Sequence, residues 1–196
     1  MPRSTRAQAE SNRQDVLDAA AALVRRRGVN GVTVPEVMSA AGLTHGGFYR
    51  HFQSKEDLVA QACAAACEEM NQERERIRAV APDAASARRT FLERYLSTKH
   101  RDAPSQGCGI AALAGDVART EADSALRQTY AKGLHDMVGQ LGDLGERPGT
   151  VDDETLVEVA LMAGALMLSR ASDGDELSER ILEAARNHLL NNRPVG

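Results

Sequence analysis

The apolar positions of this chain recur at helical spacing along almost its whole length. Residues 12–27 predict an amphipathic first helix, stopped by Gly28, with an apolar stripe made of Val16, Ala19, Ala20, Leu23 and Val24. Apolar and polar residues nowhere alternate as they do in a half-buried strand, β-branched residues are sparse, and alanine is abundant. The pattern therefore predicts an all-α fold.

Two short helices are predicted next, followed by a long one. Thr33 stands where an N-cap is expected, at the start of a helix that ends at Gly42. Thr44 can cap a third short helix in the same way. Ser54, with Asp57 three positions later, predicts the start of a fourth helix that continues to about residue 80.

Five further helices are predicted after residue 82. They are drawn at residues 84–100, 108–119, 122–143, 152–171 and 175–191, and turn signals occur at 102–104, 146–149 and 172–174. Residues 1–10 and 193–196 carry no such pattern and are expected to be loose. We therefore predict a first domain over residues 10–70, with the two short helices at 33–52, and a second helical domain over residues 71–196.

The two short helices have the layout of a helix-turn-helix. Residues 41–44, Ala-Gly-Leu-Thr, form the turn, in which glycine permits a sharp bend and leaves the second helix free to enter a DNA major groove. Phe48 and Phe52 are four residues apart, so both are predicted to lie on the buried face of that helix. The helix is expected to continue through Phe52. Its remaining surface combines hydrogen-bond donors with bare backbone, at His45, Gly46, Gly47, Tyr49, Arg50 and His51.

The distribution of charge supports a polyanion as partner, although the net charge does not. The chain has 24 basic and 28 acidic residues, a net charge of -4. Residues 1–55 hold eight basic and four acidic residues, so this part is +4 and the remainder is -8. A basic first segment on an acidic remainder is typical of a nucleic-acid-binding domain joined to a separate body.

Residues 33–58 resemble the DNA-binding domain of the TetR family of transcriptional regulators. The resemblance rests on Thr-Val-Pro-Glu-Val at 33–37, Ala-Gly-Leu-Thr at 41–44, Gly-Phe-Tyr-Arg-His-Phe at 47–52 and Ser-Lys-Glu-Asp-Leu at 54–58. It covers about residues 10–65. It implies a homodimeric, usually repressing regulator whose C-terminal helices bind a small molecule.

The resemblance also implies roles for individual residues. Thr33 and Tyr49 would contact phosphates, Lys55 would reach the DNA backbone, and the residues that face bases would be Thr44, His45, Gly46 and Arg50, with Gly47 and His51 on the same surface. Many relatives have lysine or arginine where this chain has His45. Two alternatives stay open: Tyr49 packs inside the domain, and the arginines at 25–27 form a solvated helix end rather than a phosphate patch.

The helices predicted over residues 84–143 are expected to enclose an effector pocket. Its candidate lining is Phe91, Tyr95, His100, Cys108, Leu113, Val117, Tyr130, Leu134 and Met137. The same spacing also suits plain core packing.

Cys108 lies between two glycines where one of these helices is predicted to begin. A helix N-terminus would lower the pKa of the thiol, and Lys99, His100 and Arg101 would act in the same direction. The segment resembles a branch of the TetR family with Gly-Cys at this position, and some members of the family sense electrophiles or oxidants through a cysteine. The alternative is a small buried cysteine.

The last two predicted helices carry an apolar face with small residues at its centre. Such a face suits close pairing with a symmetry mate, and the family resemblance implies a dimer interface of four helices here. The candidate interface residues are Leu156, Ala160, Ala163, Gly164, Met167, Ile181 and Leu189. An ordinary core within the chain is the alternative.

Metal binding, cofactor binding and membrane insertion are not expected. Cys63 and Cys67 are four apart on one helix face, but no further ligands stand at metal-binding spacing, so both are interpreted as core. No apolar run is long enough to span a membrane and no signal peptide is visible, so we expect a cytoplasmic protein with reduced cysteines.

Together these features predict a non-enzymatic regulator: a homodimeric repressor released from operator DNA by a small molecule or a thiol-reactive compound. One alternative is a helical enzyme with Cys108 as nucleophile and His100 or His135 as base, although no catalytic motif accompanies them. Another is a noncatalytic ligand-binding or scaffold protein.

Overall fold

The computed structural model describes residues 6–144 and 152–191, which form helices joined by turns, with no strand among them. This confirms the predicted all-α fold. The helices are α1 (Arg6–Arg27), α2 (Val34–Ala40), the 3-10 helix η1 (His45–Arg50), α3 (Lys55–Val80), α4 (Ala84–Tyr95), α5 (Thr98–Asp102), the 3-10 helix η2 (Pro104–Gln106), α6 (Gly109–Ala118), α7 (Ala125–Gly142), α8 (Asp153–Ala171) and α9 (Glu176–Asn191). The turn expected at 146–149 and the loose end expected at 193–196 lie outside the described residues.

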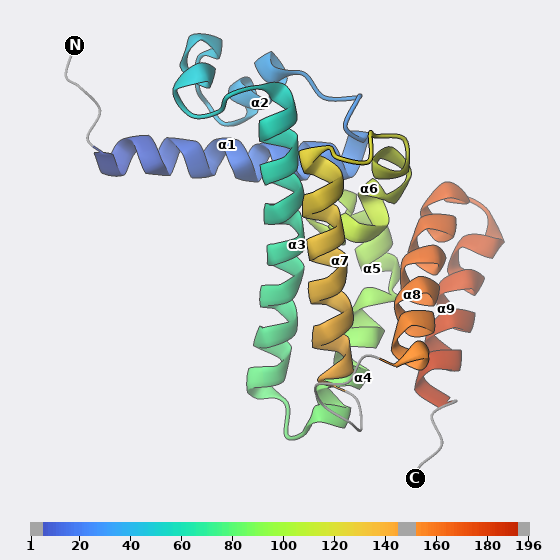
Figure 1. The fold of residues 1–196 in the computed structure, drawn as a ribbon. Helices are drawn as coiled ribbons and strands as arrows, with labels where there is room; N and C mark the ends of the chain where they lie inside the picture. The colour runs from blue at the N-terminus through green and yellow to red at the C-terminus, as the bar shows by residue number, and fades with distance from the viewer. Residues whose placement is uncertain (1–5, 145–151, 192–196) are drawn as a thin grey trace.

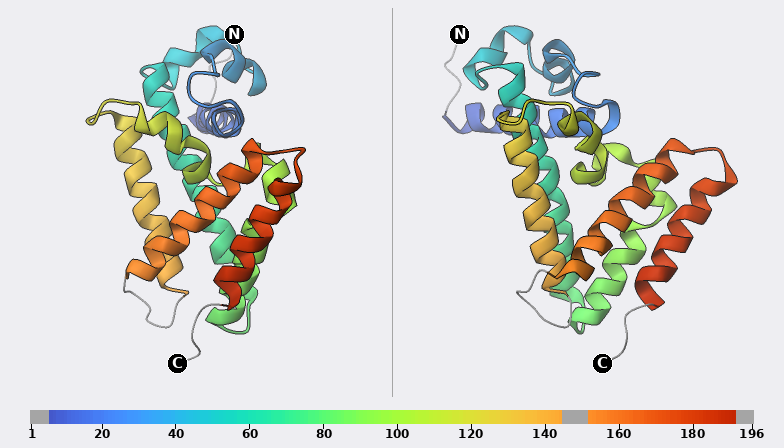
Figure 2. Two further views of the ribbon diagram at one scale, coloured as in Figure 1. Left: turned by 90° about the vertical axis from the view of Figure 1, so that its right-hand side faces the viewer. Right: turned by 45° about the vertical axis from the view of Figure 1, so that its right-hand side comes forward.

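The helices form a head and a body that share one long helix (Figure 1). We call α1, α2 and η1 the head and α4 to α9 the body, and α3 runs from one into the other. In the body α3 packs along α7, while α8 and α9 lie side by side at the edge of the molecule (Figure 2). The domain boundary predicted after residue 70 falls inside α3.

The start of α3 shows how the sequence fixes the junction of head and body. The Ser54 hydroxyl accepts a hydrogen bond from the backbone N–H of Asp57 at 3.1 Å, and the Asp57 carboxylate accepts one from the backbone N–H of Gln53 at 3.0 Å. These side chains satisfy amides that the first turn of a helix leaves without partners. The helix begins at Lys55 and ends at Val80, as predicted.

Three other predicted helices differ from the observed ones. The first starts at Arg6 rather than at 12, because residues 6–11 are good helix formers without glycine or proline, so the part of the expected loose end that is described is helical. The predicted helix at 84–100 divides at residues 96 and 97, where the Ser97 hydroxyl accepts the His100 N–H at 3.2 Å and begins α5. The 122–143 helix starts at Ala125, where the Ser124 hydroxyl accepts the Arg127 N–H.

Two polar contacts join helices across the core. Arg88 of α4 pairs with Glu158 of α8 at 2.6 Å, and both side chains are nearly inaccessible to solvent. Asp116 in the last turn of α6 accepts the backbone N–H of Val29 at 3.0 Å, just after Gly28 ends α1 with a φ of 73°. The second contact ties the body directly to the turn between the first two helices of the head.

Among the described residues, no helix combines the length and the apolar character that a membrane crossing requires.

Candidate nucleic-acid interface and ligand cavity

The short helix η1 is held on the head by two phenylalanines. Phe48 and Phe52 are both buried, as the spacing of four residues predicted, and their rings stack with centroids 5.7 Å apart. Gly42, with a φ of 70°, makes the turn from α2, and the backbone N–H of Leu43 bonds to Met38 at 2.9 Å. The sharp turn and the buried rings together fix which face of η1 points outward.

The observed η1 is shorter and more tightly wound than predicted. It is a 3-10 helix that ends at Arg50, whereas an ordinary helix through Phe52 was expected, so that expectation is wrong. Gly46 and Gly47 explain the difference, because glycine in a helix costs about 1 kcal/mol relative to alanine and weakens a short α-helical segment. Thr44 stands at the N-cap position without a hydrogen bond from its side chain.

The outward face of η1 carries the predicted DNA-binding side chains. Tyr49 is 76% exposed although its neighbour Phe48 is buried, and their rings meet edge to face at 5.1 Å. The other candidates of this segment divide into an exposed set, Thr44, His45, Gly46 and Arg50, and a half-buried set, Gly47, His51 and Lys55. The alternative in which Tyr49 packs inside the domain is excluded by its exposure.

Thr33 lies at the start of α2 with its side chain engaged by Glu36. The Glu36 carboxylate accepts the Thr33 backbone N–H at 3.0 Å and its hydroxyl at 2.8 Å. These hydrogen bonds stabilise the charged form and lower the pKa of Glu36. Thr33 is exposed, so an oxygen lone pair and the surface of the residue remain open to a partner.

The three arginines that end α1 do not act as one group. Arg25 is buried and pairs with Glu69 of α3 at 2.7 Å, so neither a solvated helix end nor a free phosphate patch describes it. Arg26 and Arg27 are exposed, and Arg27 pairs with Glu36 at 3.2 Å.

A cavity of about 470 Å³ opens between α3, α4, α5 and η2. Three predicted pocket residues line it, Phe91, Tyr95 and His100. The other lining residues, which sequence reasoning missed, are Met70, Glu73, Ile77, Arg94, Ser97, Lys99, Ala103 and Gln106. Met70 and Ile77 stand seven residues apart on α3, so helical spacing placed them on one face, but only the fold shows that α4 and α5 meet that face.

The remaining predicted pocket residues lie in the core rather than in the lining of that cavity. Cys108, Leu113, Val117 and Met137 are buried, and Tyr130 and Leu134 are partly buried against the core. The Tyr130 hydroxyl donates a hydrogen bond to the backbone oxygen of Ile110 at 2.9 Å, which ties α7 to α6.

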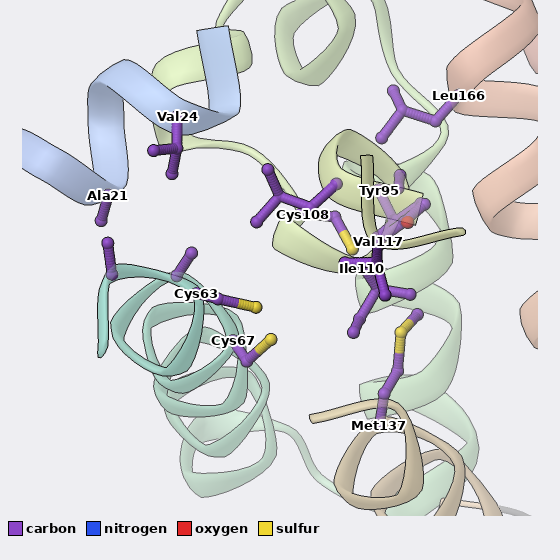
Figure 3. Close-up of a cluster of buried hydrophobic side chains, with 14 of the residues drawn as sticks. Ala21, Val24, Cys63, Cys67, Tyr95, Cys108, Ile110, Val117, Met137 and Leu166 are labelled. Carbon is purple, nitrogen blue, oxygen red and sulfur yellow. The ribbon is translucent and has the colours of Figure 1, made fainter. Parts of the chain in front are cut away.

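Cys108 occupies the N-cap of α6, but its thiol is not activated. The residue is 1% exposed, and burial raises the pKa of the thiol even though contacts with Tyr95 and the first amides of α6 act against the rise. The predicted lowering of this pKa is therefore wrong, because removal from water outweighs the favourable field of the helix end. Figure 3 shows the thiol inside the core, near Tyr95 and Ile110.

His100 is not placed to act as a base for Cys108. Its Nδ1 donates a hydrogen bond to the Tyr95 carbonyl at 2.7 Å, and its Nε2 accepts the backbone N–H of Cys108 at 3.0 Å. Burial lowers the pKa of the imidazole to about 4. The other candidate base, His135, is exposed on α7. The geometry gives no support to the nucleophilic-enzyme alternative.

Cys63 and Cys67 are buried on the face of α3 that meets α6 and α7 (Figure 3). Gly133 of α7 lies so close to Cys67 that an added Cβ would stand 2.5 Å from the sulfur, so this glycine permits the close approach of the two helices. Among the described residues, His, Cys, Asp and Glu nowhere gather in a group of three or more suited to hold a metal ion.

The outer surface of α8 and α9 is apolar. Val157, Leu168 and Leu177 are exposed by 62%, 60% and 50%, and they accompany the predicted interface residues Leu156 and Met167 at 48% and 40%. Ala160 is exposed, Ala163, Gly164 and Ile181 are half-buried, and Leu189 is buried within the chain. A Cβ at Gly164 would meet open space. We call Val157, Ala160, Gly164, Leu168 and Leu177 the α8–α9 face.

Comparisons with known proteins agree with this architecture. Residues 16–62 match the family model described as bacterial regulatory proteins, tetR family. The chain is 39% identical over 61 residues to the HTH-type transcriptional regulator AcrR of Shigella flexneri, a match to 31% of this chain and 28% of AcrR. It is 27% identical over 152 residues to the HTH-type transcriptional repressor KstR2 of Rhodococcus jostii, covering 76% and 72% of the two chains.

Similarity to solved structures extends beyond the head. A TetR transcriptional regulator from Chloroflexus aurantiacus superposes with a TM-score of 0.72 at 28% identity, over 94% of each chain. The AcrR match covers 31% of this chain, whereas the KstR2 match and the structural match, at 76% and 94% of it, are long enough to reach into the body. The helix-turn-helix segment at residues 16–62 therefore belongs to the TetR family of bacterial transcriptional regulators, and the described helices share the architecture of a solved TetR regulator.

Proposed function

We propose that the chain is a homodimeric repressor that binds operator DNA through η1 and leaves it when a small molecule occupies the cavity. The observation that carries the DNA-binding part is the contrast in solvent exposure between neighbouring side chains of η1. Phe48 is buried whereas the adjacent Tyr49 is 76% exposed, with Thr44, His45 and Arg50 exposed beside it. A surface rich in donors, held by a buried apolar anchor, is what insertion into a major groove requires.

The assigned DNA contacts are of two kinds: contacts to phosphates that position the head, and contacts to bases that recognise the sequence. Tyr49, Thr33 and Lys55 would bind phosphates, which fixes the orientation of the head on DNA. Arg50, Thr44 and His45 would face base edges in the major groove, together with the bare backbone at Gly46. Lys55 is the first residue of α3, so a phosphate contact there would couple DNA directly to the helix that enters the body.

The α8–α9 face supports the dimeric part of the proposal. A monomer rarely exposes several large apolar side chains on one pair of adjacent helices without a partner. Ala160 and Gly164 leave the surface of α8 low between Val157 and Leu168, which suits close packing against a symmetry-related copy. Two heads would then reach two half-sites of one operator.

The cavity of about 470 Å³ supports the ligand-binding part. Its volume is in the range of small-molecule sites, and its apolar floor contains Phe91, Met70 and Ile77. His100 lines the cavity and bonds to the N-cap of α6, and Asp116 at the other end of α6 bonds to Val29 in the head. A ligand that displaces α6 would therefore move the head. Such a ligand acts only through different affinities for the two arrangements.

The DNA-binding surface is tested with a duplex chosen by the protein itself. The purified full-length chain selects from a library of 40-base-pair random duplexes, and fluorescence anisotropy then measures its affinity for the enriched sequence. We expect Tyr49→Ala and Lys55→Ala each to weaken binding by about tenfold, because each removes a phosphate contact. The salt dependence of binding should also become shallower for Lys55→Ala.

Arg89→Ala is the matched control, because Arg89 is an exposed arginine of α4, remote from the head, and should leave the affinity unchanged. If Tyr49→Ala and Lys55→Ala bind like the unaltered protein at every salt concentration, the assigned DNA surface is refuted. Failure of the library to enrich any sequence would refute operator binding as such.

A further inference from the structure

A second hollow, which we call the junction groove, lies between the end of α1 and the body. Its volume is about 550 Å³, and it shares no lining residue with the cavity described above. Its charged lining is formed by Arg25, Arg26, Arg101, Arg170, Asp102 and Asp173. Four arginines and two aspartates therefore line one hollow, and α6 and α8 supply its apolar wall.

Ion pairs leave two of these arginines without a carboxylate. Arg101 pairs with both Asp102, at 2.6 Å, and Asp173, at 3.9 Å. Arg25 pairs with Glu69. Within residues 6–144 and 152–191, no carboxylate forms an ion pair with Arg26 or Arg170. The unmatched positive charge of the groove thus comes from α1 on one side and α8 on the other.

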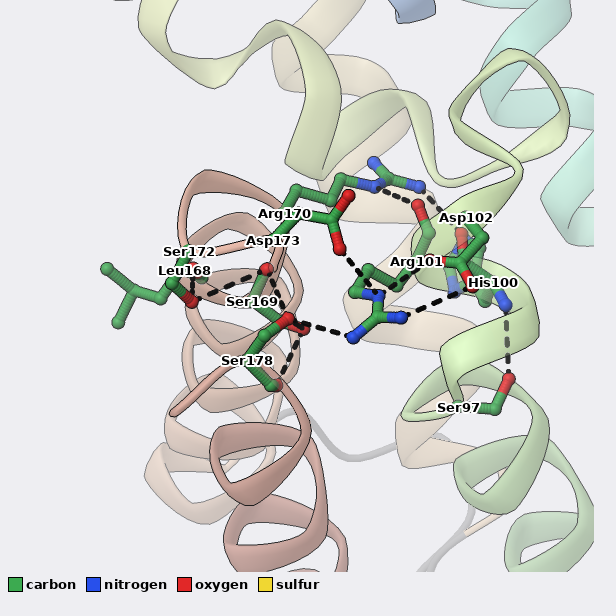
Figure 4. Close-up of polar contacts among 10 residues, drawn as sticks. All are labelled: Ser97, His100, Arg101, Asp102, Leu168, Ser169, Arg170, Ser172, Asp173 and Ser178. Carbon is green, nitrogen blue, oxygen red and sulfur yellow. Dashed lines mark hydrogen bonds and ion pairs between the residues drawn. The ribbon is translucent and has the colours of Figure 1, made fainter. Parts of the chain in front are cut away.

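Arg170 is fixed in position by the backbone of the body. Its Nε donates to the carbonyl of Arg101 at 3.2 Å and its Nη2 donates to the carbonyl of His100 at 3.0 Å. The remaining Nη1 forms no hydrogen bond to any described residue, and Figure 4 shows two of the three guanidinium nitrogens bonded and the third without a partner. A half-buried guanidinium held in place with one free edge is arranged to bind an anion.

The junction groove is separate from the proposed DNA surface. In Figure 1, α2 lies on one side of α1, whereas α5, α6 and α8 lie on the other. Arg25 and Arg26 stand in the last turn of α1 and face the body in this groove. DNA bound at η1 would therefore not occupy the groove.

We propose that the junction groove binds a small phosphorylated molecule, which bridges Arg26 of the head and Arg170 of the body. A phosphate accepts hydrogen bonds from two guanidinium groups at once and carries enough charge to match both. The groove is larger than one phosphate, and its volume lies in the range of small-molecule sites, so the apolar wall would contact the rest of the ligand. The bound molecule would link head and body.

Isothermal titration calorimetry on the full-length protein without DNA tests this proposal, with inorganic pyrophosphate and adenosine diphosphate as the two probes. We expect saturable binding of at least one probe, weakened about tenfold by Arg26→Gln, because one charge-assisted contact is lost. Arg27→Gln is the matched control, because Arg27 is the adjacent exposed arginine and does not line the groove. It should bind the probes like the unaltered protein.

Two further variants make the result decisive. Arg170→Lys keeps a charge but loses the fork that bonds to backbone and phosphate, so it should also weaken binding, with its folding checked by circular dichroism. Arg50→Gln removes a charge from the DNA surface and should bind the probes normally.

The proposal is overturned if neither probe saturates. It is equally overturned if Arg50→Gln abolishes binding while Arg26→Gln does not, since the anion would then occupy the DNA surface. Because no DNA is present, these outcomes do not depend on operator binding.

Discussion

His100 shows how burial and two hydrogen bonds select one protonation state of a side chain. Its Nδ1–H is donated to the Tyr95 carbonyl, and its Nε2 must be unprotonated to accept the N–H of Cys108. A second proton on the ring would have to break the bond to Cys108 and place a charge in the core. Burial accordingly lowers the pKa of the imidazole from 6.5 to about 4.

This lowered pKa predicts a loss of stability in acid. The unfolded chain binds a proton at His100 below pH 6.5, whereas the folded chain does so only near pH 4. The contribution of His100 to the free energy of unfolding is therefore complete above about pH 6.5 and decreases as the pH falls toward 4. Between pH 7.5 and pH 5.0 the loss from this residue is about 2 kcal/mol.

Urea unfolding at the two pH values measures this loss. His100→Gln should reduce the difference between them by about 2 kcal/mol, whatever its effect at pH 7.5. His135→Gln serves as the control, because His135 is exposed on α7. An unchanged pH dependence in His100→Gln would show that the imidazole does not titrate as the structure indicates.

The three cysteines are expected to react slowly in the folded protein. Cys63, Cys67 and Cys108 are all buried, and burial raises the pKa of the Cys108 thiol, so few thiolates are accessible. Alkylation by iodoacetamide, followed by mass spectrometry, should be at least about 100-fold slower in buffer than in urea, because reaction must await local opening. Rapid and selective labelling of Cys108 in the folded chain would instead support a thiol sensor.

The burial of a side chain could be predicted where it follows from the local sequence pattern, and could not be predicted where it depends on contacts between distant helices. The inward phenylalanines follow from a spacing of four residues, and their burial places the intervening Tyr49 outside. The environment of Cys108 is different, because its burial depends on Tyr95 of α4, His100 of α5 and the packing of α6. Nothing within the segment itself reports that the helix N-terminus is closed to water.

At the scale of elements, hydrogen-bonding caps explain which boundaries could be predicted. Ser54 and Asp57 mark the start of α3 in a pattern that the sequence shows directly. The break between α4 and α5 also depends on a capping serine, Ser97, but that serine stands within a run with helical spacing. The cavity is built around this break. Its lining could therefore be predicted only for Phe91, Tyr95 and His100, which lie on either side of the break.

Gly46 of η1 leads to a prediction in which one substitution has opposite effects on the stability of the fold and on DNA affinity. A Cβ at Gly46 would meet no atom within 4 Å, and the backbone there is not in the left-handed region. Gly46→Ala should therefore raise the free energy of unfolding by about 0.4–1 kcal/mol, because alanine restricts the unfolded chain. If the backbone at residue 46 approaches DNA closely, the same methyl group should weaken binding to the selected duplex by about tenfold.

Gly139→Ala is the control for this experiment. Gly139 lies in α7, where an added Cβ also meets open space, so the variant should gain stability without losing DNA affinity. Urea unfolding and fluorescence anisotropy provide the two measurements. A Gly46→Ala protein that binds the duplex normally would show that glycine is not needed there for close approach.

At the scale of the whole molecule, the basic segment that contains the head and the α8–α9 face lie in different parts of the structure. The +4 segment of residues 1–55 contains the head, and the acidic remainder contains most of α3 and the body. The body of one copy would repel that of another at long range, so association must come from short-range apolar contact. The α8–α9 face offers such contact, whereas Arg88 and Glu158 are already paired inside the chain.

Leu168→Glu tests whether this face joins two copies. Leu168 is 60% exposed, so the substitution should not disturb the core of one chain, but it places a charge within the proposed interface. Analytical ultracentrifugation should find the unaltered protein as a dimer and the variant as a monomer at the same concentration. The monomer should also lose most of its affinity for the selected duplex, because one head contacts only one half-site. Val80→Glu makes the same change at the end of α3, where the side chain is 85% exposed, and should stay dimeric. A dimeric Leu168→Glu protein would place the interface elsewhere on the molecule.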